Sequence, residues 1–111
     1  MKRPSKYRNK PTVVDGIRFA SQAEARRDAE LQLLARAGEI FALRRQPRYP
    51  LIVNGAKVCT YVADWEYVEK PTPGGPTKTI CEDKKGVVTP AFRIKFKLAK
   101  ALFPEIDWRV T

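Results

Sequence analysis

The sequence predicts a mixed α/β fold, a core ordered α-β-β-β-α-β that follows an N-terminal β-hairpin. The chain has 111 residues, which is near the usual size for a single hydrophobic core. Apolar residues make up 43% of it, enough to fill a packed interior. Two segments with helix-capping signals stand among several runs with strand composition. We therefore expect a mixed central sheet flanked by helices.

The chain begins with a basic N-terminal arm, residues 1–11, followed by a single domain over residues 12–111. The arm contains no acidic residue and five basic ones: Lys2, Arg3, Lys6, Arg8 and Lys10. A mobile tail and an arm that contacts nucleic-acid phosphates are compatible interpretations.

Within the domain, Asp15–Gly16 lies between two short apolar runs and predicts a hairpin turn. Residues 21–38 then have the pattern of a helix. Ser21 is the expected N-cap, Glu24 has capping-box spacing from it, and Gly38 supplies the stop.

The middle of the chain has strand composition. Residues 39–53 are extended, with Pro47 and Pro50 as interruptions, and Asn54–Gly55 is a strong turn signal. Residues 57–69 are rich in aromatic and β-branched side chains and predict one long strand. A loop over residues 70–76 leads to a third strand over residues 77–86.

The C-terminal part predicts a helix over residues 89–104 and a last strand over residues 105–111. Pro90 lies near the start of this helix and Pro104 lies beyond its end. An apolar stripe should pack on the sheet: Phe92, Phe96, Ala99 and Phe103. A parallel basic stripe is either a solvated face or, as we favour, a contact with the DNA backbone: Arg93, Lys97 and Lys100.

Charge and composition restrict the function. Lys and Arg number 22 against 12 Asp and Glu, a net charge of +10 that indicates a polyanionic partner, which for a cytoplasmic chain is nucleic acid. Histidine is absent, so catalysis by histidine and metal binding by histidine are excluded. No apolar run is long enough for a membrane span, and the basic start is not a secretory signal. Cys59 and Cys81 are interpreted as buried reduced thiols.

Three carboxylates interrupt apolar surroundings. Glu24 begins a helical stripe expected to face the core, which Leu31, Leu34 and Ala35 continue. Taken alone, however, Glu24 is better explained by a role in the helix cap. Asp64 lies on a half-apolar face of the long strand, where a charge is costly without a partner. The alternative for Asp64 is an edge strand with cross-strand pairs to lysines.

The third group is the segment TICEDKKG, residues 79–86. In a strand, Glu82 and Lys84 share one face, and Asp83 and Lys85 share the other. Carboxylate oxygens suit Mg²⁺ or Mn²⁺, and a lysine on the same face can orient a water or stabilise charge on a phosphate. A lysine-rich solvated edge strand is the simpler alternative.

The sequence has an acid on the first helix, an acid in the second core strand and an acid-x-lysine pattern on the third. With this arrangement it resembles the PD-(D/E)xK nucleases, the restriction-endonuclease-like superfamily. The likeness is greatest to a small phage and prophage branch related to junction-resolving enzymes, and it extends over about residues 6–111, including QPRYPLIVNG, VCTYVADW and EDKKG. It implies a restriction-endonuclease-like fold with metal-binding carboxylates on one side of a mixed sheet. Here Ala63 replaces the proline of the motif.

The resemblance implies that Glu24, Asp64 and Asp83 hold Mg²⁺ or Mn²⁺ and that Lys85 completes the catalytic set. Glu82 with Lys84 is the alternative register, because Lys84 occupies a spacer position that is usually apolar. Gly86, which ends the strand directly after Lys85, favours the first register.

The implied function is a metal-dependent DNA endonuclease, structure-specific for branched DNA such as a Holliday junction, in phage DNA recombination or processing. Paired cuts on opposing strands would call for a homodimer. The expected location is the cytoplasm, that of a bacterial host if the chain is encoded by a phage. The alternative is a non-catalytic basic nucleic-acid-binding protein with a degenerate nuclease fold.

Overall fold

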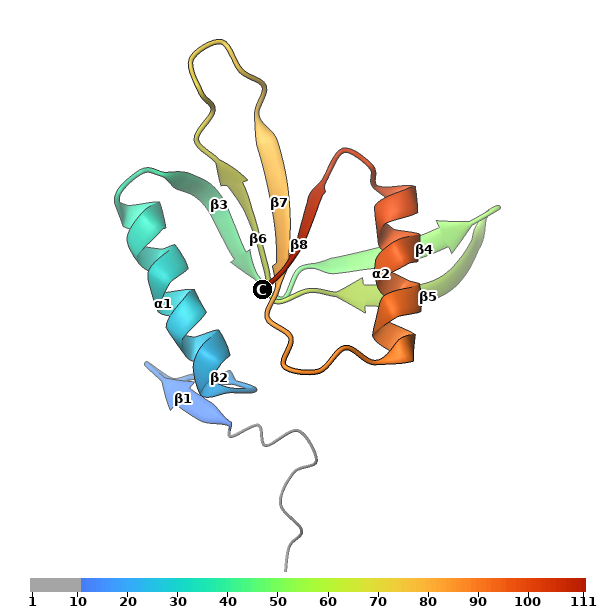
Figure 1. The fold of residues 1–111 in the computed structure, drawn as a ribbon, viewed down its shortest axis with the longest axis horizontal. Helices are drawn as coiled ribbons and strands as arrows, with labels where there is room; N and C mark the ends of the chain where they lie inside the picture. Colours follow the sequence, from blue (N-terminus) through green and yellow to red (C-terminus); the bar gives the residue numbers. More distant parts are fainter. Residues whose placement is uncertain (1–10) are drawn as a thin grey trace, which may run out of the picture.

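A computed structural model describes residues 11–111, which form two helices and eight strands. The helices lie at opposite sides of the molecule, with a four-stranded sheet between them (Figure 1). The elements are β1 Thr12–Val14, β2 Ile17–Phe19, α1 Gln22–Arg36, β3 Ile40–Arg45, β4 Arg48–Val53, β5 Ala56–Val62, β6 Trp65–Glu69, β7 Lys78–Asp83, α2 Pro90–Leu102 and β8 Asp107–Val110.

The four-stranded sheet has the order β3-β6-β7-β8. Its β7–β8 pair is parallel and its other pairs are antiparallel, so the sheet is mixed. Two further pairs are hairpins, β1–β2 and β4–β5, each turning through an αL-αL dipeptide: φ is 50° and 78° at Asp15–Gly16 and 51° and 79° at Asn54–Gly55. The predicted mixed α/β class and the N-terminal hairpin are confirmed.

The prediction of one long strand over residues 57–69 is wrong. The chain bends at Ala63–Asp64, so that β5 pairs with β4 and β6 joins the central sheet. The predicted extended segment over residues 39–53 is also interrupted, between β3 and β4, at the residues that face this bend. Gln46 N–H donates to the Asp64 carbonyl (2.8 Å), and Ala63 N–H donates to the Pro47 carbonyl (3.2 Å). Gln46 has φ of 51°, and Pro47 lacks an N–H and restricts the residue before it. The β4–β5 ribbon is thereby directed away from the sheet.

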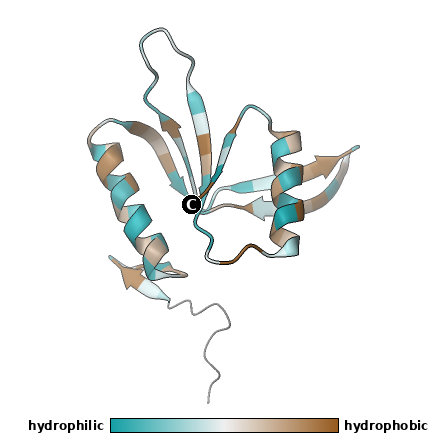
Figure 2. Ribbon diagram, viewed as in Figure 1, coloured by the Kyte–Doolittle hydropathy of each residue, from teal (hydrophilic) through white to brown (hydrophobic). Residues whose placement is uncertain are grey.

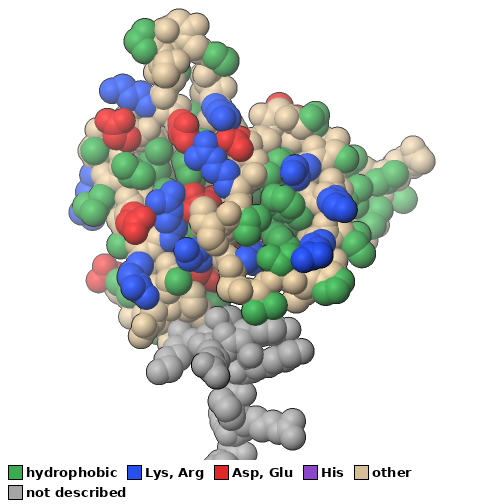
Figure 3. Space-filling model, in the orientation of Figure 1, with side chains coloured by type: hydrophobic (Ala, Val, Ile, Leu, Met, Phe, Trp, Pro, Cys, Tyr) green, Lys and Arg blue, Asp and Glu red, His purple; other side chains and the backbone are tan. Residues whose placement is uncertain are grey.

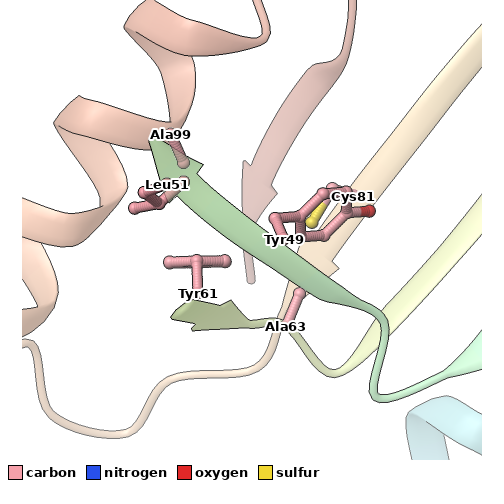
Figure 4. Packing of buried hydrophobic residues seen from close by; sticks show 6 residues of the cluster. All are labelled: Tyr49, Leu51, Tyr61, Ala63, Cys81 and Ala99. Carbon is pink, nitrogen blue, oxygen red and sulfur yellow. The ribbon is translucent and has the colours of Figure 1, made fainter. Parts of the chain in front are cut away.

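The bend divides the aromatic residues of this segment between two cores. Trp65 and Tyr67 pack with Leu31, Ile40 and Ile80 on the α1 side. The other core lies between the β4–β5 ribbon, β7 and α2 and contains Tyr49, Leu51, Tyr61, Ala63, Cys81 and Ala99 (Figure 4). Tyr61 and Trp65 are four residues apart and would share one face of a continuous strand, but because of the bend they enter different cores.

The helices begin where the capping signals predict. The Ser21 hydroxyl accepts a hydrogen bond from Glu24 N–H, and the Thr89 hydroxyl accepts one from Phe92 N–H, both at 3.1 Å. Gly38, with φ of 76°, follows the end of α1. The predicted apolar stripe of α2 packs as expected on the second core.

One helix prediction and one cysteine prediction fail. Leu34 is 37% exposed, and the inward stripe of α1 contains Asp28 together with Leu31. Asp28 therefore takes an interior position that the sequence pattern assigned to apolar residues. Both cysteines are free, but Cys81 alone is buried, since Cys59 is half-buried at the edge of the second core.

The outer part of the β4–β5 ribbon carries hydrophobic side chains, visible in brown in Figure 2. Ile52 and Val58 are 49% and 59% exposed there. Neither helix in residues 11–111 has the length and apolar character needed to cross a membrane.

Candidate functional site

The two carboxylates at the end of β7 are both buried but have different partners. Glu82 is 0% exposed and Asp83 is 1% exposed. Because side chains alternate along a strand, Glu82 faces the α1 side with Ile80, and Asp83 faces the α2 side with Cys81. Adjacent positions of one strand thus supply two separate carboxylate environments.

Glu82 is fully occupied by hydrogen bonds. Arg27 of α1 binds it through Nε (2.6 Å) and Nη2 (2.9 Å), and the Tyr67 hydroxyl donates to it at 2.6 Å. Burial alone would raise the pKa of Glu82, but these donors hold it below its usual value. The cluster of Glu82, Arg27 and Tyr67 ties α1 to the sheet, which leaves Glu82 without a free oxygen for a ligand.

Asp83, in contrast, retains an oxygen that no hydrogen bond satisfies. The Tyr61 hydroxyl donates to Oδ2, while Oδ1 is buried and has no hydrogen-bond partner among the described residues. Lys85 Nζ lies 3.6 Å from Oδ1 and 4.8 Å from the centre of the Phe92 ring. Buried polar atoms are nearly always paired, so an unpaired carboxylate oxygen beside an ammonium group is a candidate ligand position.

Asp64 lies at the corner between β5 and β6. Its Oδ2 accepts a hydrogen bond of 2.7 Å from the backbone N–H of Lys84, which fixes the carboxylate against the end of β7. Burial raises the pKa of Asp64 to about 7, and the charges of Glu24 and Asp83 contribute in the same direction. Because burial disfavours the ionised carboxylate of Asp64, a nearby cation would stabilise that ionised form.

Glu24 projects from the first turn of α1 toward the same region. Its pKa is raised, mainly by burial, although the charge of Lys85 acts in the opposite direction. Glu24, Asp64 and Lys85 line a common cavity of about 280 Å³. We call this the carboxylate cavity; Asp83 lies beside it through its contact with Lys85.

Two further polar side chains line the carboxylate cavity. One is Gln46, which lies at the bend before Pro47. Arg18, from the β1–β2 hairpin, was missed. Its sequence signal is a single basic residue in a short strand, and only the packing of the hairpin beside α1 brings it to the cavity.

The donor set suits a hard divalent cation in chemical type. Glu24, Asp64 and Asp83 offer carboxylate oxygens, and Asp83 Oδ1 is unpaired. The side chains are not gathered into a ready cage, because no three acidic or thiol groups within residues 11–111 lie close enough to hold one ion. Side-chain rotation of Glu24 or Asp64 would be needed to complete the coordination.

A second buried network was not anticipated. Asp28 accepts two hydrogen bonds from Arg45 (2.8 and 2.9 Å) and one of 3.0 Å from Trp65 Nε1. It joins α1 to β3 and β6. Because Arg45 and Trp65 donate hydrogen bonds to both oxygens of its carboxylate, we assign Asp28 a structural role.

Of the two predicted basic surfaces, the structure describes the stripe on α2 but not the basic residues of the N-terminal arm. The side chains of Arg93, Lys97 and Lys100 are exposed on α2, and Figure 3 shows basic side chains over this helix and also between α1 and the sheet. Lys2, Arg3, Lys6, Arg8 and Lys10 lie outside the described residues.

Comparison with known proteins gives one match. A family model described as "Protein of unknown function (DUF1064)" matches residues 4–111, nearly the full chain. No curated protein and no solved structure matches the chain.

Proposed function

The chain belongs to the DUF1064 family, and from its site we propose that it is a metal-dependent endonuclease that hydrolyses phosphodiester bonds in DNA. The observation that carries the proposal is the buried Oδ1 of Asp83, which has no hydrogen-bond partner among the described residues and lies 3.6 Å from Lys85 Nζ, next to the cavity lined by Glu24 and Asp64. The net charge of +10 supports a polyanionic substrate.

The resemblance to the PD-(D/E)xK nucleases adds support through the order of the elements. With the two hairpins β1–β2 and β4–β5 set aside, the chain runs α1, β3, β6, β7, α2, β8, the α-β-β-β-α-β order that the resemblance implies. Of the two registers, we favour Asp83 with Lys85, because Glu82 is bound by Arg27 and Tyr67.

In this proposal Glu24, Asp64 and Asp83 would hold Mg²⁺ or Mn²⁺, which would supply Lewis acidity toward the phosphate and an attacking water. Lys85 would donate to a phosphate oxygen or orient the water, and its ammonium group is kept in place by Asp83 and the Phe92 ring. Tyr61 acts as a positioning residue, since it fixes the Asp83 carboxylate through Oδ2. The hydrolysis needs no covalent intermediate.

The substrate is proposed to be branched DNA. The basic surfaces suit contacts with phosphates, which carry no sequence information, so recognition would depend on the shape of the DNA. Paired cuts in opposing strands of a junction would require two active sites, which a symmetric homodimer provides.

The test is cleavage of a labelled four-way junction, beside matched duplex and single-stranded DNA, with Mg²⁺ or Mn²⁺. Wild type is compared with Asp83→Asn and with Glu39→Gln, whose side chain is exposed between α1 and β3 and does not line the carboxylate cavity. Cutting by wild type and by Glu39→Gln, together with loss of at least about a hundredfold in Asp83→Asn, would support the enzyme. DNA binding without cutting of any substrate would overturn it.

A non-catalytic nucleic-acid-binding protein is the second candidate. It is favoured by one observation, the lack of a preassembled metal site within residues 11–111. It predicts that Mg²⁺ leaves the melting temperature of the free protein unchanged. The endonuclease predicts that Mg²⁺ raises it, and that Asp83→Asn removes this increase.

A further inference from the structure

Lys84 and Lys85 line different hollows at the end of β7. Lys85 lines the carboxylate cavity, while Lys84 lines a second hollow of about 600 Å³ beside α1. The second hollow is lined by Ala23, Arg26, Arg27, Glu30, Lys84 and Thr111. We call it the cationic hollow.

Two of the three basic side chains that line the cationic hollow have no ion-pair partner among the described residues. Arg27 is held by Glu82 on one side and by Glu30 at 2.9 Å on the other. The side chains of Arg26 and Lys84 form no ion pair with any residue in 11–111. Arg26 and Lys84 are therefore available to bind a ligand, whereas Arg27 is held by Glu82 of β7.

The two hollows are linked through the backbone of β7. Lys84 N–H donates to Asp64 at the carboxylate cavity, while the Lys84 side chain reaches into the cationic hollow. Lys85 N–H in turn donates to the Thr111 carbonyl at 3.2 Å, which fixes this end of the strand. A polyanion crossing the end of β7 would pass directly from one hollow to the other.

We propose that the cationic hollow is a phosphate-binding subsite, in which Arg26 and Lys84 hold a DNA phosphate next to the one cleaved at the carboxylate cavity. This inference rests on the proposed endonuclease for the position of the cleaved bond. It gives Lys84 a role distinct from that of Lys85: Lys84 binds and positions the substrate strand.

The first test measures binding in EDTA, so that it does not depend on cleavage. Arg26→Ala, Lys84→Ala and the control Lys57→Ala, on the β4–β5 ribbon, are titrated with a labelled four-way junction at several salt concentrations. Arg26→Ala and Lys84→Ala should each weaken binding about fivefold and reduce the salt slope by about one, as expected for one lost phosphate contact. Lys57→Ala should match wild type, and Lys84→Arg should restore most of the affinity.

The second test places one uncharged methylphosphonate at each position beside the cleaved phosphate. Wild type should cut one of these substrates more slowly, whereas the Arg26→Ala/Lys84→Ala variant should cut it no more slowly than unmodified DNA. Equal slowing in both proteins at every position would overturn the subsite.

The outcomes separate the two proposals. If wild type cuts DNA but both single variants bind like wild type, the subsite alone is overturned. If wild type cuts nothing but both variants bind weakly, the hollow is a phosphate site and the endonuclease alone fails. If wild type neither binds nor cuts DNA, both are overturned.

Discussion

Glu82 and Asp83 are neighbours on β7 but differ in how completely the fold satisfies their carboxylate oxygens. Glu82 is neutralised by Arg27 and Tyr67, whereas Asp83 keeps an unpaired oxygen. Stabilising residues have their hydrogen-bonding capacity satisfied within the protein, and residues that bind a ligand leave part of it unsatisfied. We therefore expect substitutions at these two positions to affect different properties.

Glu82→Gln should lower the free energy of unfolding by roughly 2–3 kcal/mol, because it removes one partner of a buried ion pair and leaves Arg27 without its main counter-charge. Urea unfolding measures the change. Glu30→Gln is the matched control, since Glu30 is the exposed partner of the same arginine and is 62% exposed in its side chain. Its effect should stay below about 0.5 kcal/mol. Equal effects of the two substitutions would show that Glu82 has no special structural role.

Asp64 should make stability depend on pH in the metal-free protein. Its folded pKa of about 7 exceeds the ordinary value of 3.8, so the folded state binds more protons between these values. The free energy of unfolding therefore falls as pH rises from about 4 to 7. Asp64→Asn, which keeps an acceptor for Lys84 N–H, should reduce this fall by at most about 4 kcal/mol, because a pKa difference of one corresponds to about 1.4 kcal/mol. Chemical unfolding at a series of pH values measures it, and an unchanged slope would contradict the assignment.

At the scale of elements, the site is built where secondary structures begin, bend or end. Glu24 lies in the first turn of α1, Asp64 at the corner between β5 and β6, and Asp83 at the last position of β7. At such positions side chains from different elements come close together at the ends of the elements, and local hydrogen bonds such as that from Lys84 N–H to Asp64 fix them. Their precision therefore depends on how well each terminus is held.

The N-caps give a matched test of this dependence. Ser21→Ala and Thr89→Ala should each lower the free energy of unfolding by about 1 kcal/mol, because each removes the acceptor for one N–H at a helix start. Cleavage should fall further in Ser21→Ala, because the turn that Ser21 caps carries Glu24. Stability is measured by thermal unfolding and cleavage with the junction substrate. A larger loss of cleavage in Thr89→Ala would contradict this arrangement.

At the scale of the whole molecule, the basic charge is spread over several surfaces. Basic side chains lie over α2 and between α1 and the sheet (Figure 3). Such an arrangement suits a polyanion that extends across the molecule, and its energetic signature is a strong dependence of binding on salt.

Replacing the basic stripe of α2 with alanine tests how far the DNA extends. The triple variant of Arg93, Lys97 and Lys100 should reduce the slope of log affinity against log salt by about three if each residue contacts one phosphate. Its melting temperature should stay close to that of wild type, because all three side chains are exposed. Fluorescence anisotropy at several salt concentrations measures the slope. An unchanged slope would restrict the DNA interface to the region beside α1.

The sequence by itself determined the fold class, both helices, the N-cap of the first helix, both hairpin turns and the acids that interrupt apolar segments. These features depend on local conformational preferences, such as those of the glycines in Asp15–Gly16 and Asn54–Gly55, the Ser21 hydroxyl and Pro90. Such local signals, together with hydrophobic periodicities of two residues in strands and 3.6 residues in helices, can be recognised without knowledge of distant contacts.

Only the tertiary structure decided which charged residues face one another. The bend at Asp64 depends on its pairing with Gln46 and Pro47 across the hairpin, and the fate of Glu82 depends on Arg27, which is 55 residues away in the sequence. Arg18 and Asp28 carry no periodic signal that marks their positions. Strand alternation separates the faces of TICEDKKG, but packing against α1 and the β4–β5 ribbon determines which face is satisfied and which retains a free carboxylate oxygen.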